Sequence, residues 1–284
     1  VGVGTLTFNQ ASTGVLNGVG AQVAMAANMT MTGNLTLQGL GLSLAGNPTS
    51  IASTLTPTIV TGVLNMLGGA GNAASMNLSG GNLTIAAGAG NSLTVAGGTL
   101  TTGANRLIND GTATLSGALP VDATLGGIDV GSTGTLNLSA TTINVGASGL
   151  NLATGSTFNP LNSSIVGIGA GQVGTVNANA GSVVTLNGTT LNNVTFNNAS
   201  SVNQTANMLL TNGAIFNNQL GATYTLNTTA AGYLYANNTG VFNNAGTVTQ
   251  VSATPTYIYS GLYVGGVGVG TLTFNQASTG VLNG

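Results

Sequence analysis

Four charged side chains are the main groups that this sequence offers for chemistry: Arg106, Asp110, Asp122 and Asp129, alongside tyrosines and with no Lys, Glu, His or Cys. Acid–base or nucleophilic catalysis needs titratable groups within reach of one another. The best dyad is Asp122 with Asp129, seven residues apart in VDATLGGIDVG, where one corner or one strand pair would bring them together. We interpret both as turn residues and expect no enzyme.

Calcium is the next chemistry to consider. GGIDV at 126–130 matches part of the calcium-binding nonapeptide G-G-x-G-x-D-x-U-x, but it lacks the third glycine and has no second copy. Asp110, Asp122 and Asp129 are weak candidate ligands for one ion. We expect Arg106 and Asp110 to form a surface ion pair, which adds little stability. The sequence therefore predicts neither a metal nor a cofactor.

Other binding chemistries are poorly supported. GVGVGTLTF lacks the lysine of a phosphate-binding loop, and no glycine-rich string precedes a helix with the required acidic residue. One Arg cannot neutralise a nucleic-acid backbone, so we exclude nucleic acid as a partner. A membrane span needs about 20 mostly apolar residues. Polar or glycine residues interrupt every such window, including residues 51–67, so we expect no membrane span in this chain.

Short runs with strand periodicity fill the chain. GTLTF at 4–8, NLTI at 82–85 and GTLNLS at 134–139 alternate apolar and polar residues, and turn dipeptides such as Asn187-Gly188 and Asn212-Gly213 separate such runs. Hydrophobic residues make up 42% of the chain and charged residues 1%, which favours packed β structure over disorder. A chain of β-sandwich domains is the alternative fold, but the five prolines are too unevenly placed to mark regular linkers.

The longest repeat organises the whole chain. Residues 1–18 and 267–284 both read VGVGTLTFNQASTGVLNG, with an offset of 266. We therefore expect residues 1–266 to be one period of a tandem array and residues 267–284 to begin the next identical copy. The chain begins at Val1 without a Met, and we expect any secretion signal or anchor to lie outside it.

A finer repeat favours a solenoid. An apolar residue between Thr or Asn recurs at steps of 23–25 residues, and less regularly from Thr99 to Thr195. We predict an all-β parallel β-helix of about 12 rungs of about 22 residues per period. The predicted ladder positions are Thr5, Thr30, Thr54, Asn77, Thr99, Thr223, Thr247 and Thr271.

Asparagines and tyrosines suggest roles within such a solenoid. Five Asn doublets, at 192–193, 197–198, 217–218, 237–238 and 243–244, indicate either hydrogen-bonded ladders or ordinary turns. All the tyrosines fall in the last fifth of the period and form either a stacking surface for glycans or part of the core and corners. They are Tyr224, Tyr233, Tyr235, Tyr257, Tyr259 and Tyr263.

A family resemblance follows from two runs. Residues 81–117, GNLTIAAGAGNSLTVAGGTLTTGANRLINDGTATLSG, and residues 134–158, GTLNLSATTINVGASGLNLATGSTF, resemble passenger regions of bacterial autotransporters and large haemagglutinin-type adhesins. The resemblance implies a right-handed parallel β-helix on the cell exterior and transfers no functional residue.

We expect a protease-resistant structural fibre at the bacterial cell surface: a filament, stalk or sheath. Its partners would be further copies of the repeat in the same chain and, by lateral association, identical fibres. The alternative is an adhesin stalk, or a surface that binds host or neighbour-cell glycans. A Thr array also resembles the ice-binding face of some antifreeze solenoids, but the motifs at Thr135, Thr157 and Thr175 end in Asn, which would break such a face.

Overall fold

A computed structural model of the 284-residue chain describes its strands throughout and its corners mainly in the central part. Outside the strands β1–β9, β33 and β34, whose bounds follow, the described residues are 82–88, 90–117, 121–123, 126–168, 174–237 and 239–252. Side chains are described within these ranges and at residues 257 and 258.

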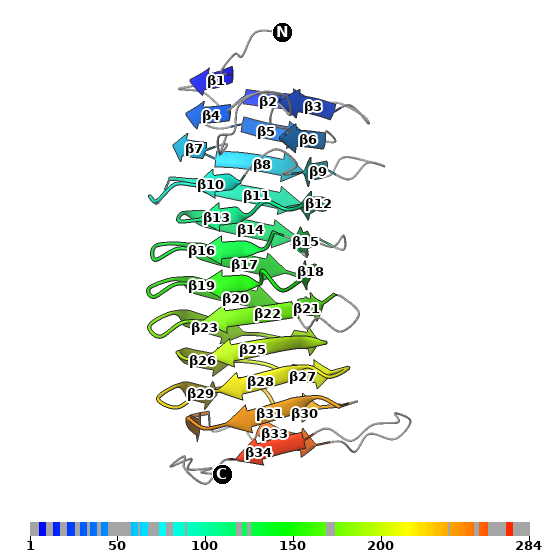
Figure 1. The fold of residues 1–284 in the computed structure, drawn as a ribbon, viewed down its shortest axis with the longest axis vertical. Helices are drawn as coiled ribbons and strands as arrows, with labels where there is room; N and C mark the ends of the chain where they lie inside the picture. The colour runs from blue at the N-terminus through cyan, green and yellow to red at the C-terminus, as the bar shows by residue number, and fades with distance from the viewer. Residues whose placement is uncertain are drawn as a thin grey trace.

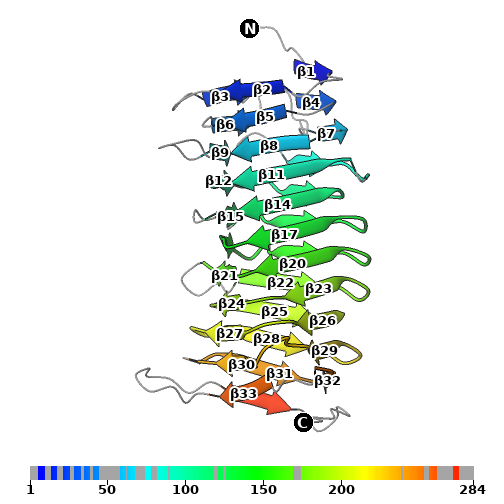
Figure 2. The ribbon, with the colours of Figure 1, turned by 180° about the vertical axis from the view of Figure 1, so that it is seen from behind.

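The described strands form three sheets, each made of parallel strands, that run along one common axis (Figures 1 and 2). Sheet A contains β1 (Leu6–Asn9), β4 (Met29–Thr32), β7 (Thr58–Thr61), β10 (Leu83–Ile85), β13 (Leu107–Asn109), β16 (Ile128–Val130), β19 (Leu150–Leu152), β22 (Gly174–Ala178), β25 (Val194–Asn198), β28 (Ile215–Asn218), β31 (Val241–Asn244) and β34 (Thr271–Phe274).

Sheet B contains β2 (Gly14–Asn17), β5 (Leu35–Gln38), β8 (Val63–Leu67), β11 (Ser92–Ala96), β14 (Thr112–Ser116), β17 (Thr135–Ser139), β20 (Thr157–Leu161), β23 (Val183–Leu186), β26 (Ser201–Gln204), β29 (Thr223–Leu226) and β32 (Thr247–Gln250). Sheet C contains β3 (Gln22–Met25), β6 (Gly41–Leu44), β9 (Ala74–Asn77), β12 (Gly98–Thr101), β15 (Val121–Ala123), β18 (Thr142–Val145), β21 (Ser164–Gly167), β24 (Thr189–Asn192), β27 (Met208–Thr211), β30 (Gly232–Ala236) and β33 (Thr256–Ser260).

Each turn of the chain contributes one strand to each sheet, so the fold is a parallel β-solenoid. From β10 to β31 it makes about seven turns of about 22 residues. The predicted fold class and turn length are therefore confirmed for this part, whereas the count of about 12 rungs is not. The turn dipeptide Asn212-Gly213 lies between β27 and β28 as expected, with φ of 51° and 79°. Asn and Gly accept this left-handed conformation at low cost.

The core follows from strand alternation. Along β17 the burial alternates, with Leu136 and Leu138 buried and their neighbours half-buried. Because every turn repeats this pattern in register, the inward side chains form columns along the axis. In one column Phe216 stacks between Phe196 and Phe242, with ring centroids 4.8 and 5.1 Å apart. Such a column is buried only where turns lie above and below it.

The register corrects the predicted threonine ladder. Thr223 and Thr247 are paired in sheet B, as predicted. Thr271, however, pairs with Val241 in sheet A, where Thr30 also lies. Asn77 and Thr99 belong to sheet C, while Thr5 and Thr54 lie outside the described residues. The T-x-T motif recurs in all three sheets, because any outward-facing strand favours Thr, and its spacing therefore mixes three columns.

Candidate functional site

The most extended polar feature of the described residues is an asparagine ladder on the outer face of sheet A. Five asparagines, one per turn on β19, β22, β25, β28 and β31, occupy one column of the strand register. From the second asparagine onward, each side-chain Nδ2 donates to Oδ1 of the asparagine in the preceding turn, over 2.8–3.0 Å. The members are Asn151, Asn177, Asn197, Asn217 and Asn243. We call them the outer ladder.

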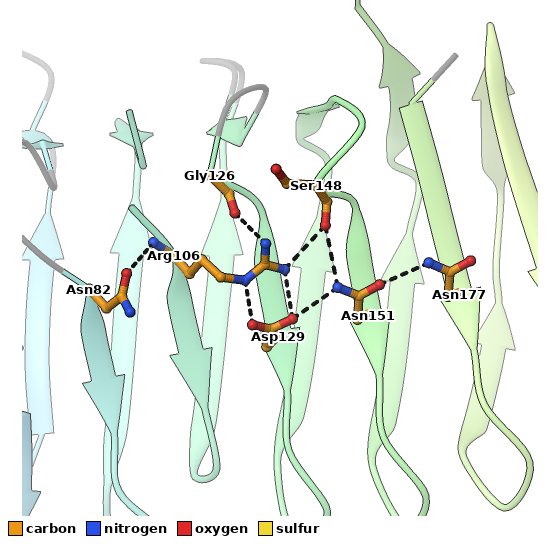
Figure 3. A network of polar contacts seen from close by, with 7 residues as sticks. All are labelled: Asn82, Arg106, Gly126, Asp129, Ser148, Asn151 and Asn177. Atoms are coloured by element: carbon orange, nitrogen blue, oxygen red, sulfur yellow. Dashed lines mark hydrogen bonds and ion pairs between the residues drawn. The ribbon is translucent and has the colours of Figure 1, made fainter. Parts of the chain in front are cut away.

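Asp129 ends the outer ladder on β16, one turn before Asn151 (Figure 3). Its Oδ1 accepts a hydrogen bond from Nδ2 of Asn151 over 2.9 Å. The guanidinium of Arg106 donates to both carboxylate oxygens, with Nη2 2.6 Å from Oδ1. The exposed fractions of the two charged side chains are 24% and 37%. Arg106 thus pairs with Asp129, and the predicted pair with Asp110 is wrong.

Arg106 also ties several turns together. Its backbone N–H donates to Oδ1 of Asn82 over 2.8 Å, in the turn before. Its guanidinium donates to the carbonyls of Gly126 and, over 3.2 Å, of Ser148, which lie in the two following turns. Together with the outer ladder, these bonds make one continuous polar seam from Asn82 to Asn243, across eight strands of sheet A.

The direction of the outer ladder explains why a carboxylate ends it. Every amide donates toward the N-terminal turn, so the last N–H needs an acceptor in the turn before it. The column continues from Asp129 to Ile108 and Thr84, and the side chain of Ile108 has no acceptor. Asp129 supplies the acceptor, and Arg106 balances its charge in a bidentate contact. Asp129 and Arg106 therefore close the open end of the outer ladder.

A second ladder lies inside the solenoid on the neighbouring residue of the same strands. Asn198 donates to Asn218 over 2.8 Å, and Asn218 donates to Asn244 over 2.6 Å, in the direction opposite to the outer ladder. All three side chains are at most 1% exposed. Asn218 also donates to the carbonyl of Thr247, the first residue of sheet B in the next turn. This inner ladder therefore attaches each corner to the turn that follows it.

The three aspartates are dispersed over the fold. Asp110 follows β13, Asp122 lies in β15 of sheet C, and Asp129 lies in β16 of sheet A. Asp122 and Asp129 are thus strand residues of different sheets, and our interpretation of both as turn residues is wrong. Among the described residues, no group of three or more acidic, His or Cys side chains is placed to hold a metal ion.

The tyrosines separate into core and surface. Tyr224 is fully buried and meets the rings of Phe216 and Phe242 edge-on, so it does not belong to an outer stacking surface. Its hydroxyl donates to Oε1 of Gln204 over 2.6 Å. Tyr233 and Tyr257 are 39% and 49% exposed and are paired in adjacent strands of sheet C.

Tyr235 lies beside Tyr233, with the ring centroids 6.3 Å apart. Tyr259 pairs with Tyr235 in the strand register, but its side chain is outside the described residues, as is the whole of Tyr263. The structure therefore places Tyr233, Tyr235 and Tyr257 near one another on the outer face of sheet C. A stacking role for these three residues stays a prediction.

The sequence contains a signal for both ladders, which the spacing of the T-x-T motifs obscured. The tripeptide Phe-Asn-Asn occurs at 196–198, 216–218 and 242–244, at steps of 20 and 26 residues. In each copy Phe joins the core, the first Asn the outer ladder and the second Asn the inner ladder. The Asn doublets at these positions thus form ladders, as one of our two interpretations predicted. The capping role of Arg106 and Asp129 had no comparable signal.

The comparisons with known proteins add little to this geometry. No family model matches the chain, and no curated protein matches it. Among solved structures, a TibC-catalyzed hyper-glycosylated fragment of TibA is 15% identical, with 97% of each chain covered and a TM-score of 0.19. Since that TM-score reflects little superposition, we draw nothing about function from the match. Among the described residues, no helix is long and apolar enough to cross a membrane.

Adjacent residues of β28 allow the two ladders to be compared. We expect Asn217→Ala to lower the free energy of unfolding by about 1 kcal/mol. Its partners in the outer ladder, Asn197 and Asn243, are half-buried and can form hydrogen bonds to water instead. Asn218→Ala should cost about 2–3 kcal/mol, because it removes hydrogen bonds from buried groups of Asn198, Asn244 and Thr247. Chemical denaturation of both variants followed by circular dichroism measures the difference, and an Asn217→Ala variant as unstable as Asn218→Ala would contradict it.

Alkaline pH should act through Tyr224. Burial raises the pKa of this phenol well above its ordinary value, so the folded state keeps it neutral while the unfolded chain ionises it near pH 10. Its contribution to stability is complete below about pH 10 and is lost as the pH rises further, by up to about 1.4 kcal/mol per pH unit.

We therefore expect melting temperatures to fall steeply above about pH 10, and less steeply in Tyr224→Phe, which keeps the ring and removes the proton. The variant should be less stable at neutral pH, because Oε1 of Gln204 loses its donor. Equal alkaline slopes in the two proteins would show that Tyr224 is not the responsible group.

Proposed function

We propose that the chain is part of a structural extracellular fibre: a continuous β-solenoid, built from tandem repeats, that serves as a surface filament, stalk or sheath and has no catalytic chemistry. The observation that supports this most is the seam of sheet A, in which neighbouring turns are joined from Asn82 to Asn243 by side-chain hydrogen bonds in addition to the backbone ladder. Such a seam strengthens the axial contacts between turns.

The strand register supports continuity between copies. The column of sheet A that contains the inner ladder starts at Phe8 on β1 and reaches Phe274 on β34 through eleven pairings. Phe8 and Phe274 are the same position in successive copies, 266 residues apart. We propose that each copy therefore continues the solenoid of the previous one without a linker, with eleven turns per period in place of about 12.

The setting follows from the same proposal. We place the fibre on a bacterial cell surface, on the strength of the resemblance of residues 81–117 and 134–158 to passenger regions and of the solenoid fold. Its partners are further copies of the repeat in the same chain and, at its sides, identical fibres. The composition supports side-by-side association, because charged residues make up only 1% of the chain and fibres would repel one another little.

Adhesion is the second candidate, favoured by one observation. Tyr233, Tyr235 and Tyr257 form an aromatic patch on a surface otherwise rich in Thr, Ser and Asn. Aromatic faces stack on sugar rings, so this patch suits a neutral glycan of a host or neighbouring cell. A non-repetitive domain beyond the array would favour this role, whereas uniform filaments made of the array alone favour the structural one.

Proteolysis tests the structural proposal. Trypsin is uninformative, because the chain contains one Arg and no Lys. We expect the native fibre to resist a protease of broad specificity for hours, since the paired strands do not fit an active site that binds extended chain. The same fibre after heat denaturation is the control and should be cleaved within minutes. Rapid digestion of the native fibre at sites within strands would rule out a continuous solenoid.

A further inference from the structure

The charged residues of the chain are confined to a narrow band. Arg106, Asp110, Asp122 and Asp129 fall within 24 residues of sequence, and residues 130–284 contain no charged residue at all. In the solenoid, this band spans β13 to β16. The outer surface from β17 onward therefore carries no charged side chain, and any partner that contacts it must be recognised by shape, hydrogen bonding and apolar contact.

Within this neutral part, sheet A has the most regular outer face. The outer ladder occupies one column on β22, β25, β28 and β31. The neighbouring column, two residues earlier in each strand, consists of Thr175, Thr195, Ile215 and Val241, all β-branched and half-buried. An amide column beside a β-branched column makes a flat strip that extends over four turns.

The amides of this strip have hydrogen-bonding capacity beyond the ladder. A primary amide has two N–H donors and two lone pairs, and the ladder uses one of each at Asn177, Asn197 and Asn217. Each turn therefore offers one further donor and one further acceptor, at a spacing of about 4.8 Å. A partner that matches this array must carry both a donor and an acceptor at the same spacing. A second copy of the same strip meets both conditions.

The outer faces of sheets B and C are less suited to such packing. In sheet B, Asn137 and Asn159 are bonded over 3.0 Å, but the column continues with Thr185, and Val183 protrudes beside it with 51% exposure. In sheet C, the outward residues change in size from Thr190 to Leu209 to Tyr235 along the turns. Neither face repeats one side chain over four turns.

We propose that the outer face of sheet A from β22 to β31 is the surface through which two copies of this chain pack side by side, with outer ladder against outer ladder. The inference rests on the lateral association in the proposed function and assigns it to one face. The interface would be a polar zipper of amides, of the kind that stacked Asn side chains form between sheets, with the β-branched column packed along one edge.

Lysine substitutions beside the ladder test the proposal without breaking the ladder itself. Ile215→Lys with Val241→Lys places two charges on the strip. The matched control, Thr225→Lys with Thr249→Lys, places two charges on the outer face of sheet B in neighbouring strands of the same turns. Sedimentation velocity of the 284-residue chain measures self-association, and circular dichroism establishes that each variant is folded.

We expect the wild-type chain and the sheet B control to associate, and the sheet A variant to need about tenfold or more protein for the same association, because like charges oppose each other across the interface. If both variants associate as the wild type does, the assigned face is wrong while lateral association stands. If the wild-type chain remains monomeric at high concentration, the lateral association within the proposed function fails together with the face, and the proteolysis result alone decides whether the chain is a fibre.

Discussion

Stacking of one turn on the next is the interaction on which the rest of this structure depends. A single turn of about 22 residues has an inward row of apolar side chains but nothing above or below to cover it. Phe216 illustrates this, because its two faces are covered by Phe196 and Phe242 from the adjacent turns. The stability of any one turn therefore resides largely in its neighbours, as in other repeat proteins.

In-register stacking also determines what the polar residues do. When identical side chains lie one above another at about 4.8 Å, an amide can donate to the next amide, whereas like charges would repel. The outer and inner ladders use this geometry on opposite faces of the same strands and run in opposite directions. Asp129 and Arg106 occupy the end of the outer ladder, where an acceptor is required and a compensating cation makes the carboxylate acceptable.

Sequence reasoning could predict the solenoid, because alternation and turn dipeptides report local geometry and one motif recurs every 23–25 residues over parts of the chain. It could not assign turns to columns: Thr30 and Thr271 belong to sheet A and Thr223 to sheet B, although all share the same T-x-T motif. Corner lengths vary from turn to turn, so constant spacing is a poor guide to register. The Phe-Asn-Asn tripeptides were better markers, since each combines a core residue with one residue of each ladder.

The ion pair shows the remaining limit. Arg106 lies closer in sequence to Asp110, yet it pairs with Asp129, which lies in the following turn. Side chains 23 residues apart can be recognised as neighbours only when the strand register is known. Similarly, the burial of Tyr224 follows from its place on the inward side of β29, whereas Tyr233 on β30 faces outward. In a solenoid, the function of a side chain depends on its turn and its sheet as well as on its type.

Fibre diffraction from oriented tandem arrays directly tests whether the turns stack continuously along one axis. We predict a strong axial spacing of about 4.8 Å together with a long axial period of about 53 Å, the rise of eleven turns. A pattern without the axial spacing of about 4.8 Å, or images that show separate beads joined by linkers, would contradict it.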